Sequence, residues 1–159
     1  MAFHFDELRP GQRIEAGPRV ISRADIDSFS ELSGDHTALH TDEAFAAASP
    51  LGGLVAHGAL NLSVATGLAY ASGAFDGTVL AFRELRARFD RPVFPGDQVA
   101  LELEVTGLDE RPRPESGKVQ LAMRLVNQAG KRVLSGEWTL VLARQQPGRA
   151  DSSPSPETT

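Results

Sequence analysis

The sequence predicts an α+β fold in which a curved antiparallel sheet wraps around one long helix. Residues 58–72 are apolar on most faces and carry few charges, as expected for a helix that is buried rather than lying on a surface. The chain from residue 78 onward alternates apolar and polar residues, which indicates strands. A sheet that curves around the helix satisfies the helix's need for burial.

The first elements are a strand and a short helix. The strand is predicted over Gln12–Ile21. Ser22 is typical of an N-cap, and Asp25, three residues later, completes a carboxylate version of the capping box. An amphipathic helix over Arg23–Leu32 follows. It is predicted to end at Gly34, since glycine tolerates the left-handed conformation found after helices.

The next stretch leads to the central helix. Residues 35–40 are predicted to form a loop, and Thr41 is predicted to cap a helix over 42–48. After a glycine-containing linker, the long helix is predicted over 58–72. Its alanine and glycine residues allow a sheet to approach closely.

Four strands are predicted in the remaining chain. They cover Thr78–Phe89, the alternating stretches around 99–105 and 119–125, and Lys131–Ala143, with a hairpin turn at 127–130. One early strand, helices, and then four antiparallel strands around a central helix form the hot-dog arrangement. Because one sheet face covers only one side of the helix, a partner subunit is also expected.

The chain is predicted to form one domain over residues 1–144, followed by a disordered tail. Residues 145–159 lack large apolar side chains and repeat serine and proline. Residues 109–117 are polar and proline-rich, so an exposed loop is expected there.

Composition excludes several classes of function. The net charge of −5 and the pI near 5.3 argue against nucleic acid as a partner. The absence of cysteine excludes disulfides, a thiol nucleophile and Cys-ligated metals. The N-terminus does not resemble a signal peptide, and no apolar run has the length of about 18 residues that suggests a membrane span. We therefore expect a cytoplasmic protein without a membrane partner.

Three residues suggest chemistry at the start of the central helix. Asp35 and His40 lie in the predicted loop, where a carboxylate and an imidazole can together hold one water and exchange protons with it. Gly58 opens the long helix, and its N–H lies at the positive end of the helix dipole, which suits an oxyanion. Each signal alone has a structural explanation: Asp35 could simply be a turn residue, and Gly58 could simply permit close packing.

The two signals together resemble the MaoC-like dehydratases, a family that includes (R)-specific enoyl-CoA hydratases. The resemblance lies in the segment Gly34-Asp35-His36-Thr37-Ala38-Leu39-His40, in Ala56-His57-Gly58, and in the later stretch Phe89–Asp97. It covers about residues 10–143. It implies the hot-dog fold and a hydro-lyase that adds water to a 2-enoyl thioester or removes it from an (R)-3-hydroxyacyl thioester.

The resemblance also implies roles for individual residues. Asp35 and His40 would hold the catalytic water, and the Gly58 N–H would bind the thioester oxygen. A serine or threonine of the central helix would hold the aspartate, which by position is Thr66, with Ser63 as the other candidate. Thr37-Ala38 replaces the Asn-Pro of the family motif, so an altered loop geometry is expected, with Thr37 still able to form a hydrogen bond.

Other candidates are weaker. His57 is interpreted as a supporting structural side chain and His36 as an exposed loop residue. Asp35, His36 and His40 lack the further ligands of a closed shell, so no metal is expected. Arg88 is the candidate for binding the phosphates of coenzyme A or phosphopantetheine, although a solvated strand face also explains the arginines near it. Five residues could line an acyl pocket or simply belong to the core: Leu54, Leu60, Leu68, Tyr70 and Phe75.

Two rival functions remain. A hot-dog thioesterase also needs a helix N–H but usually carries an acid on the central helix, where this sequence has Asn61. A non-catalytic subunit that binds acyl thioesters is the other. No cofactor is expected beyond the coenzyme A or acyl carrier protein to which the substrate is attached, and a homodimer or higher homo-oligomer is expected.

Overall fold

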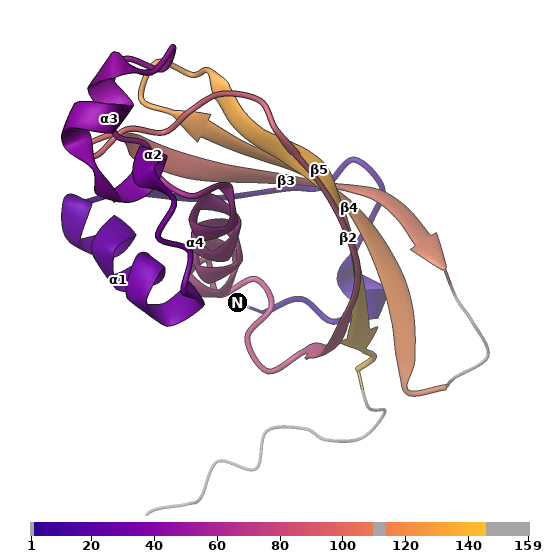
Figure 1. Cartoon of the computed structure of the whole chain (residues 1–159). Helices are drawn as coiled ribbons and strands as arrows, with labels where there is room; N and C mark the ends of the chain where they lie inside the picture. Colours follow the sequence, from indigo (N-terminus) through magenta and orange to yellow (C-terminus); the bar gives the residue numbers. More distant parts are fainter. Residues whose placement is uncertain (1, 110–113, 146–159) are drawn as a thin grey trace, which may run out of the picture.

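The structure, a computed structural model, describes residues 2–109 and 114–145. Five antiparallel strands form one sheet in the order β1-β3-β4-β5-β2. The sheet curves over α4 (Gly58–Ala71), which lies in its concave side (Figure 1). This arrangement confirms the predicted α+β class. The strands are β1 (Arg13–Val20), β2 (Val79–Phe89), β3 (Gln98–Asp109), β4 (Ser116–Asn127) and β5 (Arg132–Ala143).

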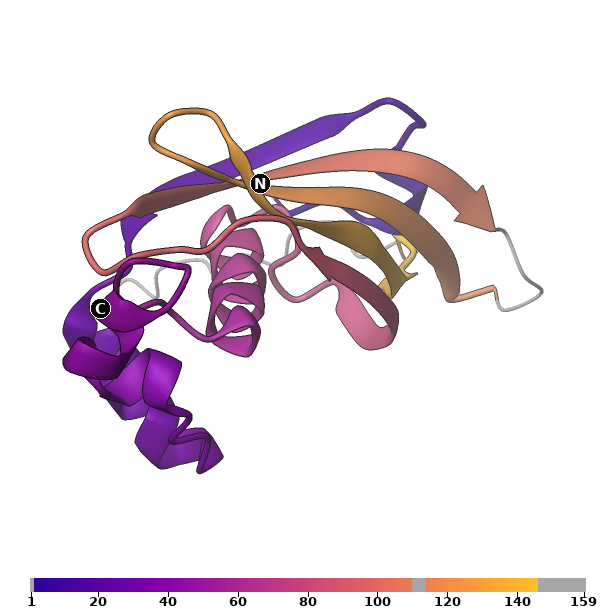
Figure 2. The same cartoon turned by 45° about the horizontal axis from the view of Figure 1, so that its top comes forward.

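Three short helices form a separate group beside α4, as Figures 1 and 2 show. They are α1 (Arg23–Ser33), α2 (Ala38–Thr41) and α3 (Glu43–Ala48), and a 3₁₀ turn, η1 (Phe5–Glu7), precedes β1. All three lie between β1 and α4 in the chain. The sequence therefore places this group next to the N-terminus of α4.

The ends of α1 are formed as predicted. The Ser22 hydroxyl accepts a hydrogen bond from the Asp25 N–H at 3.0 Å, and the Asp25 carboxylate accepts one from the Ser22 N–H at 2.8 Å. Gly34 ends the helix with φ +74°, a left-handed conformation that favours glycine. Both signals are local, which explains why the sequence alone was sufficient.

The stretch after α1 differs from the prediction. Residues 35–40 are not a continuous loop, because α2 begins at Ala38. Thr41 does not cap α3, since its hydroxyl bonds to the carbonyl oxygens of His36 and Thr37 instead. Asp42 is the cap, and its carboxylate accepts from the Phe45 N–H at 2.9 Å. The extra turn of helix shortens the loop that carries Asp35.

The helix α4 is buried on one side rather than on all sides. Its buried residues pack against the inner face of the sheet, where Trp138 and Leu121 lie. The remaining face carries exposed positions in the described structure: Ala59, Ser63, Thr66, Gly67 and Tyr70. In the single chain the sheet covers one side of α4, as expected, and burial of the other side by a partner subunit stays a prediction.

Two predicted segments lie partly or wholly outside the described residues. Residues 110–113, in the middle of the predicted 109–117 loop, lie outside the described part of the chain. So do residues 146–159 of the predicted tail. Asp109 and Ser116 themselves belong to β3 and β4. In the part of the chain that the structure describes, no helix combines the length and the apolar character needed to span a membrane.

Candidate active site

Asp35 lies just after the end of α1, in the short loop that leads to α2. Its carboxylate oxygen Oδ1 accepts two hydrogen bonds from Thr37, one from the hydroxyl at 2.6 Å and one from the N–H at 3.1 Å. These bonds, the hydroxyl first, lower the pKa of the Asp35 carboxyl below its ordinary value. Asp35 is therefore an exposed carboxylate at neutral pH, fixed by its own loop.

His40 lies on α2 and is held by the linker that precedes α4. Its Nδ1 lies 2.8 Å from the carbonyl oxygen of Val55. A carbonyl can only accept, so Nδ1 carries the proton and Nε2 keeps a lone pair in the neutral ring. The Val55 N–H in turn donates to the Leu39 carbonyl at 3.2 Å. One residue of the linker thus fixes both the position and the tautomer of the histidine.

His57 is the residue before α4, and its side chain is buried at 2% exposure. Its Nε2 lies 3.0 Å from the carbonyl oxygen of Asp35 and 3.2 Å from the hydroxyl of Ser30. Its ring stacks on the His40 ring with 3.9 Å between centroids. The structure therefore brings Asp35, His40 and His57 into one cluster.

The spacing of the cluster fits a water molecule. Each of the three side chains has one oxygen or nitrogen within 4.8 Å of those of the other two, a spacing that a single water can bridge. A metal needs ligand lone pairs that converge on it at about 2.0–2.2 Å. The Nε2–H of His57 donates to the Asp35 carbonyl, so this nitrogen has no free lone pair for a metal, and the absence of a metal stays a prediction.

Gly58 begins α4 directly after His57, so its N–H lies at the end of the helix next to the cluster. Among the described residues, no hydrogen bond uses this N–H, as is usual in the first turn of a helix. Phe89, at the end of β2, packs against the glycine. A Cβ placed on Gly58 would lie 2.7 Å from the Phe89 ring. The glycine thus permits close packing and also presents a helix N–H.

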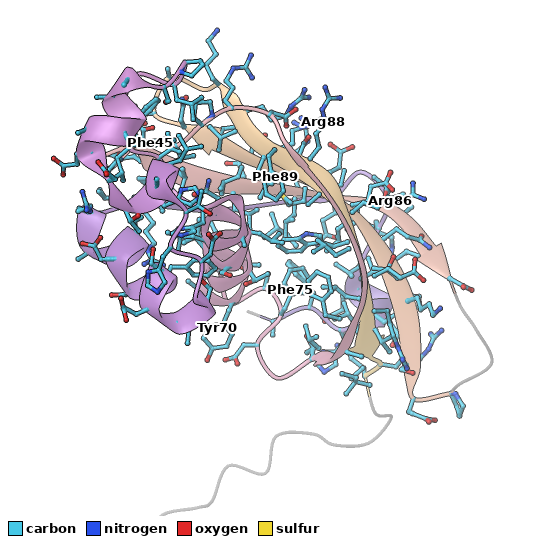
Figure 3. All side chains as sticks on the ribbon, in the orientation of Figure 1. Phe45, Tyr70, Phe75, Arg86, Arg88 and Phe89 are labelled. Atoms are coloured by element: carbon cyan, nitrogen blue, oxygen red, sulfur yellow. The ribbon has the colours of Figure 1, made fainter. Side chains whose placement is uncertain are left out.

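Three of the predicted site residues do not join the cluster. The hydroxyl of Ser63 donates to the Ala59 carbonyl and that of Thr66 to the Ser63 carbonyl, so neither bonds to Asp35. Arg88 lies on the outer face of the sheet, where Figure 3 shows it pointing away from α4 together with Arg86. Its Nε lies 3.4 Å from the Asp90 carboxylate.

Two contributors were missed by the sequence analysis. Ser30 reaches His57 from α1, and the carbonyl of Val55 holds His40. The sequence signal for Ser30 is a serine on the otherwise apolar side of an amphipathic helix, one turn after Ile26. No signal marks a backbone carbonyl such as that of Val55.

An apolar cavity of about 280 Å³ lies toward the other end of α4. Figure 3 shows Phe75 pointing into the space between the helix and the sheet. Of the residues predicted for an acyl pocket, Tyr70 and Phe75 line this cavity, whereas Leu54, Leu60 and Leu68 do not. Six of the lining residues are Thr66, Ala69, Tyr70, Phe75, Phe82 and Trp138.

Comparison with known proteins identifies the family. The model of the MaoC-like domain matches residues 6–127, which is most of the chain. The chain belongs to the MaoC-like domain family. The (R)-specific enoyl-CoA hydratase of Aeromonas caviae is 33% identical over 130 residues, which are 82% of this chain and 92% of that protein.

The MaoC-like domain also forms part of longer relatives. The protein MaoC of Klebsiella aerogenes is 36% identical over 100 residues, or 63% of this chain, but these cover only 30% of that protein. Among solved structures, R-hydratase PhaJ1 from Pseudomonas aeruginosa has a TM-score of 0.75 and 31% identity, and the match covers 98% of this chain and 96% of that one. A Mycobacterium tuberculosis protein described as a double hot-dog fold has a TM-score of 0.80 at 24% identity over 98% of this chain and 48% of its own. This last similarity supports the fold alone, which confirms the hot-dog prediction.

Proposed function

We propose that this MaoC-like protein is a hydro-lyase that adds water to a 2-enoyl thioester or removes it from an (R)-3-hydroxyacyl thioester. The observation that carries the proposal is the cluster of Asp35 and His40 beside the N-terminus of α4. The name of the Aeromonas relative, an (R)-specific enoyl-CoA hydratase, supports the same reaction. The chemistry needs no metal or redox cofactor, because the reaction moves only one water and its protons.

In hydration, the water would donate hydrogen bonds to the Asp35 carboxylate and to Nε2 of His40. Its oxygen would then attack the β-carbon of the enoyl thioester while one proton passes to His40. His40 returns that proton to the α-carbon, so that the side chain is regenerated and one water is added. Asp35, with its lowered pKa, remains an anion that orients the water and stabilises the transient imidazolium. Dehydration follows the same path in reverse.

The N–H of Gly58 would receive the thioester oxygen. Negative charge collects on that oxygen only when the enolate-like state forms, so a hydrogen bond there accelerates the reaction rather than merely binding the substrate. One such donor is typically worth about 3–4 kcal/mol. The N-terminal position on α4 adds the favourable field of the helix.

The apolar cavity is proposed to take the acyl chain. Its α4 residues, Thr66 to Tyr70, lie eight to twelve residues beyond Gly58, or about 12–18 Å along the helix axis. A four-carbon acyl group bound at Gly58 would end before the cavity, whereas a chain long enough to span about 12 Å would reach it. This placement favours the longer enoyl thioesters.

The rival thioesterase function has less support. A hydrolase of this fold would need an acid on α4 next to the thioester, and α4 carries none. Asn61 is buried at 5% exposure and so does not face a substrate. A non-catalytic acyl-binding role does not explain why Asp35 and His40 are each fixed with a lone pair left for a shared water.

A panel of 2-enoyl and 3-hydroxyacyl thioesters, on coenzyme A and on acyl carrier protein, tests the proposal. We expect water addition and loss with the wild-type protein, and a fall of at least about 100-fold in the Asp35→Asn variant. The same reactions should release no free thiol. A folded Asp35→Asn variant as fast as the wild type, or thiol release without hydration, would overturn the proposal. A cytoplasmic location remains a prediction from the sequence.

A second copy of the chain is proposed to cover β2. This strand of eleven residues is an edge of the sheet, because it pairs only with β5. It exposes several large apolar side chains: Val79, Leu80, Phe82, Leu85 and Phe89. A long apolar edge strand invites strand pairing, and self-pairing around a twofold axis would close the sheet edge.

The oligomeric state tests the second copy. Light scattering should show a dimer for the wild-type chain and a monomer for Leu80→Lys, which places a charge on the exposed edge. Leu32→Lys on α1, also strongly exposed at 84%, serves as the matched control and should remain dimeric. A monomeric wild type would refute this part of the proposal.

A further inference from the structure

The proposed chemistry uses Asp35 and His40 but leaves His57 without a role, although it is the most buried of the three. The side chain is 2% exposed, while Asp35 is exposed and His40 is half-buried. The burial of this histidine next to two site residues calls for an explanation, and the contacts of its side chain provide one.

The hydrogen bond of His57 acts on the backbone of Asp35. The carbonyl oxygen of Asp35 can only accept, so Nε2 of His57 is the donor at 3.0 Å. The hydroxyl oxygen of Ser30 lies 3.2 Å from the same nitrogen, where it can share this N–H as a second acceptor. Ser30 is in the last turns of α1 and is itself buried at 2%. The ring thus connects α1 to the loop that starts where α1 ends.

The face of the His57 ring packs against the His40 ring. The two rings stack with 3.9 Å between centroids and 29° between planes. On α1, the ring of Phe29 lies 5.0 Å away at 56°. His40 already has one fixed point at its Nδ1, the Val55 carbonyl. The stack provides a second constraint, which sets the plane in which its Nε2 points.

His57 is poorly suited to exchange a proton with a substrate itself. Its Nε2 is occupied, and its Nδ1 is buried with no hydrogen-bond partner among the described residues. Proton transfer requires a direct approach within about 2.6–3.2 Å or through one water. A role through its two neighbours is therefore the one that the geometry allows.

We propose that His57 is a positioning residue that holds the Asp35 backbone with its Nε2–H and the His40 ring with its face, supported by Ser30. The inference rests on the proposed hydratase function. A single rigid ring then sets the distance between the carboxylate and the imidazole that share the water. A displacement of about 1 Å between such groups can lower a rate by about 100-fold.

Two substitutions separate the two contacts. His57→Phe keeps a flat ring for the stack and removes the donor, whereas His57→Gln keeps a donor near the Nε2 position and removes the ring. Both should lower kcat by about 10-fold to 100-fold with little change in KM. Ser30→Ala is the milder variant, and it should lower kcat by less than about 10-fold, since it removes only a supporting contact.

Matched controls are present in the chain. His36→Gln makes the same substitution in the exposed histidine beside Asp35, and Ser28→Ala makes the same one on an exposed position of α1. Neither should change kcat. An unchanged kcat in both His57 variants, or a rise in KM alone, would overturn the inference while leaving the hydratase function intact.

A measurement that does not depend on activity completes the test. Hydrogen exchange should show faster exchange of the amides of residues 35–40 in His57→Phe and Ser30→Ala, and the NMR signals of the His40 ring should shift in His57→Gln. If the wild type hydrates no thioester, the proposed function fails, and these measurements still decide whether His57 positions the loop. Should His57→Phe not fold, Ser30→Ala decides, and unchanged exchange in the loop refutes the inference.

Discussion

The two ends of α4 are built in different ways. At the N-terminal end, polar groups come from α1, α2 and the linker before α4, and hydrogen bonds to backbone carbonyls fix both histidines. At the C-terminal end, apolar side chains of α4, β2 and β5 surround a cavity of about 280 Å³. Directional bonds position reacting groups, while apolar surfaces select by size and shape. Reaction and acyl selection should therefore respond to different substitutions.

The largest effect is expected at the polar end. His40→Ala removes the side chain that would take and return the proton, so kcat should fall by about 100-fold to 10,000-fold. His36→Ala, four residues earlier and exposed, is the control and should retain full activity. Steady-state kinetics with an enoyl-CoA thioester checks this. Equal activity of the two variants would show that the polar end does not perform the reaction.

The next effect belongs to the apolar end. Ala69→Leu should fill part of the cavity, so kcat/KM should fall by about 10-fold or more for chains of about fourteen or more carbons and stay nearly constant for crotonyl-CoA. Ala71→Leu is the same substitution at an exposed position of α4 outside the cavity. A loss of activity on every chain length alike in Ala69→Leu would show that the two ends are not independent.

A smaller effect concerns the contact between the polar end and β2. A Cβ on Gly58 would meet the Phe89 ring at 2.7 Å, so Gly58→Ala should displace that ring. In a double-mutant cycle, Phe89→Ala should relieve the strain, with a coupling free energy of about 1 kcal/mol in urea unfolding. Strict additivity of the two substitutions would mean that contact with Phe89 is not the reason for a glycine at position 58.

The smallest effect is a change in pH dependence. The Thr37 hydroxyl is the main cause of the lowered pKa of Asp35. Thr37→Val removes it, so the pKa of Asp35 should rise toward its ordinary value and the acid limb of the kcat/KM profile should move to higher pH. Thr37→Ser keeps the hydroxyl and should keep the profile. The plateau at neutral pH should change little, because Asp35 is ionised there in all three proteins.

Much of the fold followed from local patterns. The capping box of Ser22 and Asp25 and the left-handed Gly34 depend only on neighbours in the chain. Alternation of apolar residues along β3 and β4 predicted which side chains face the core. The stretch from 35 to 40 was less predictable, because the helix that begins at Ala38 is only one turn long. One turn is too short to show a repeating pattern of apolar residues.

The sequence marked three residues of the site but not the contacts that hold them. Asp35, His40 and Gly58 are marked by residue type and order, and the structure places them around the start of α4. The partner of Asp35 was expected on α4, at Thr66 or Ser63, yet its carboxylate is held by Thr37 in its own loop. Which face of a helix meets a loop depends on how the helix packs, and that is a property of the whole core.

By itself, then, the sequence determined the wrapped-sheet architecture, the ends of α1 and the residue types that carry the chemistry, since these depend on periodicity and on neighbours in the chain. Only the tertiary structure decided that Thr37 holds the Asp35 carboxylate, that Arg88 points away from the site, and that His57 contacts both Asp35 and His40. These outcomes depend on contacts between segments far apart in the chain. The energies of such contacts are fixed jointly by all the packed elements.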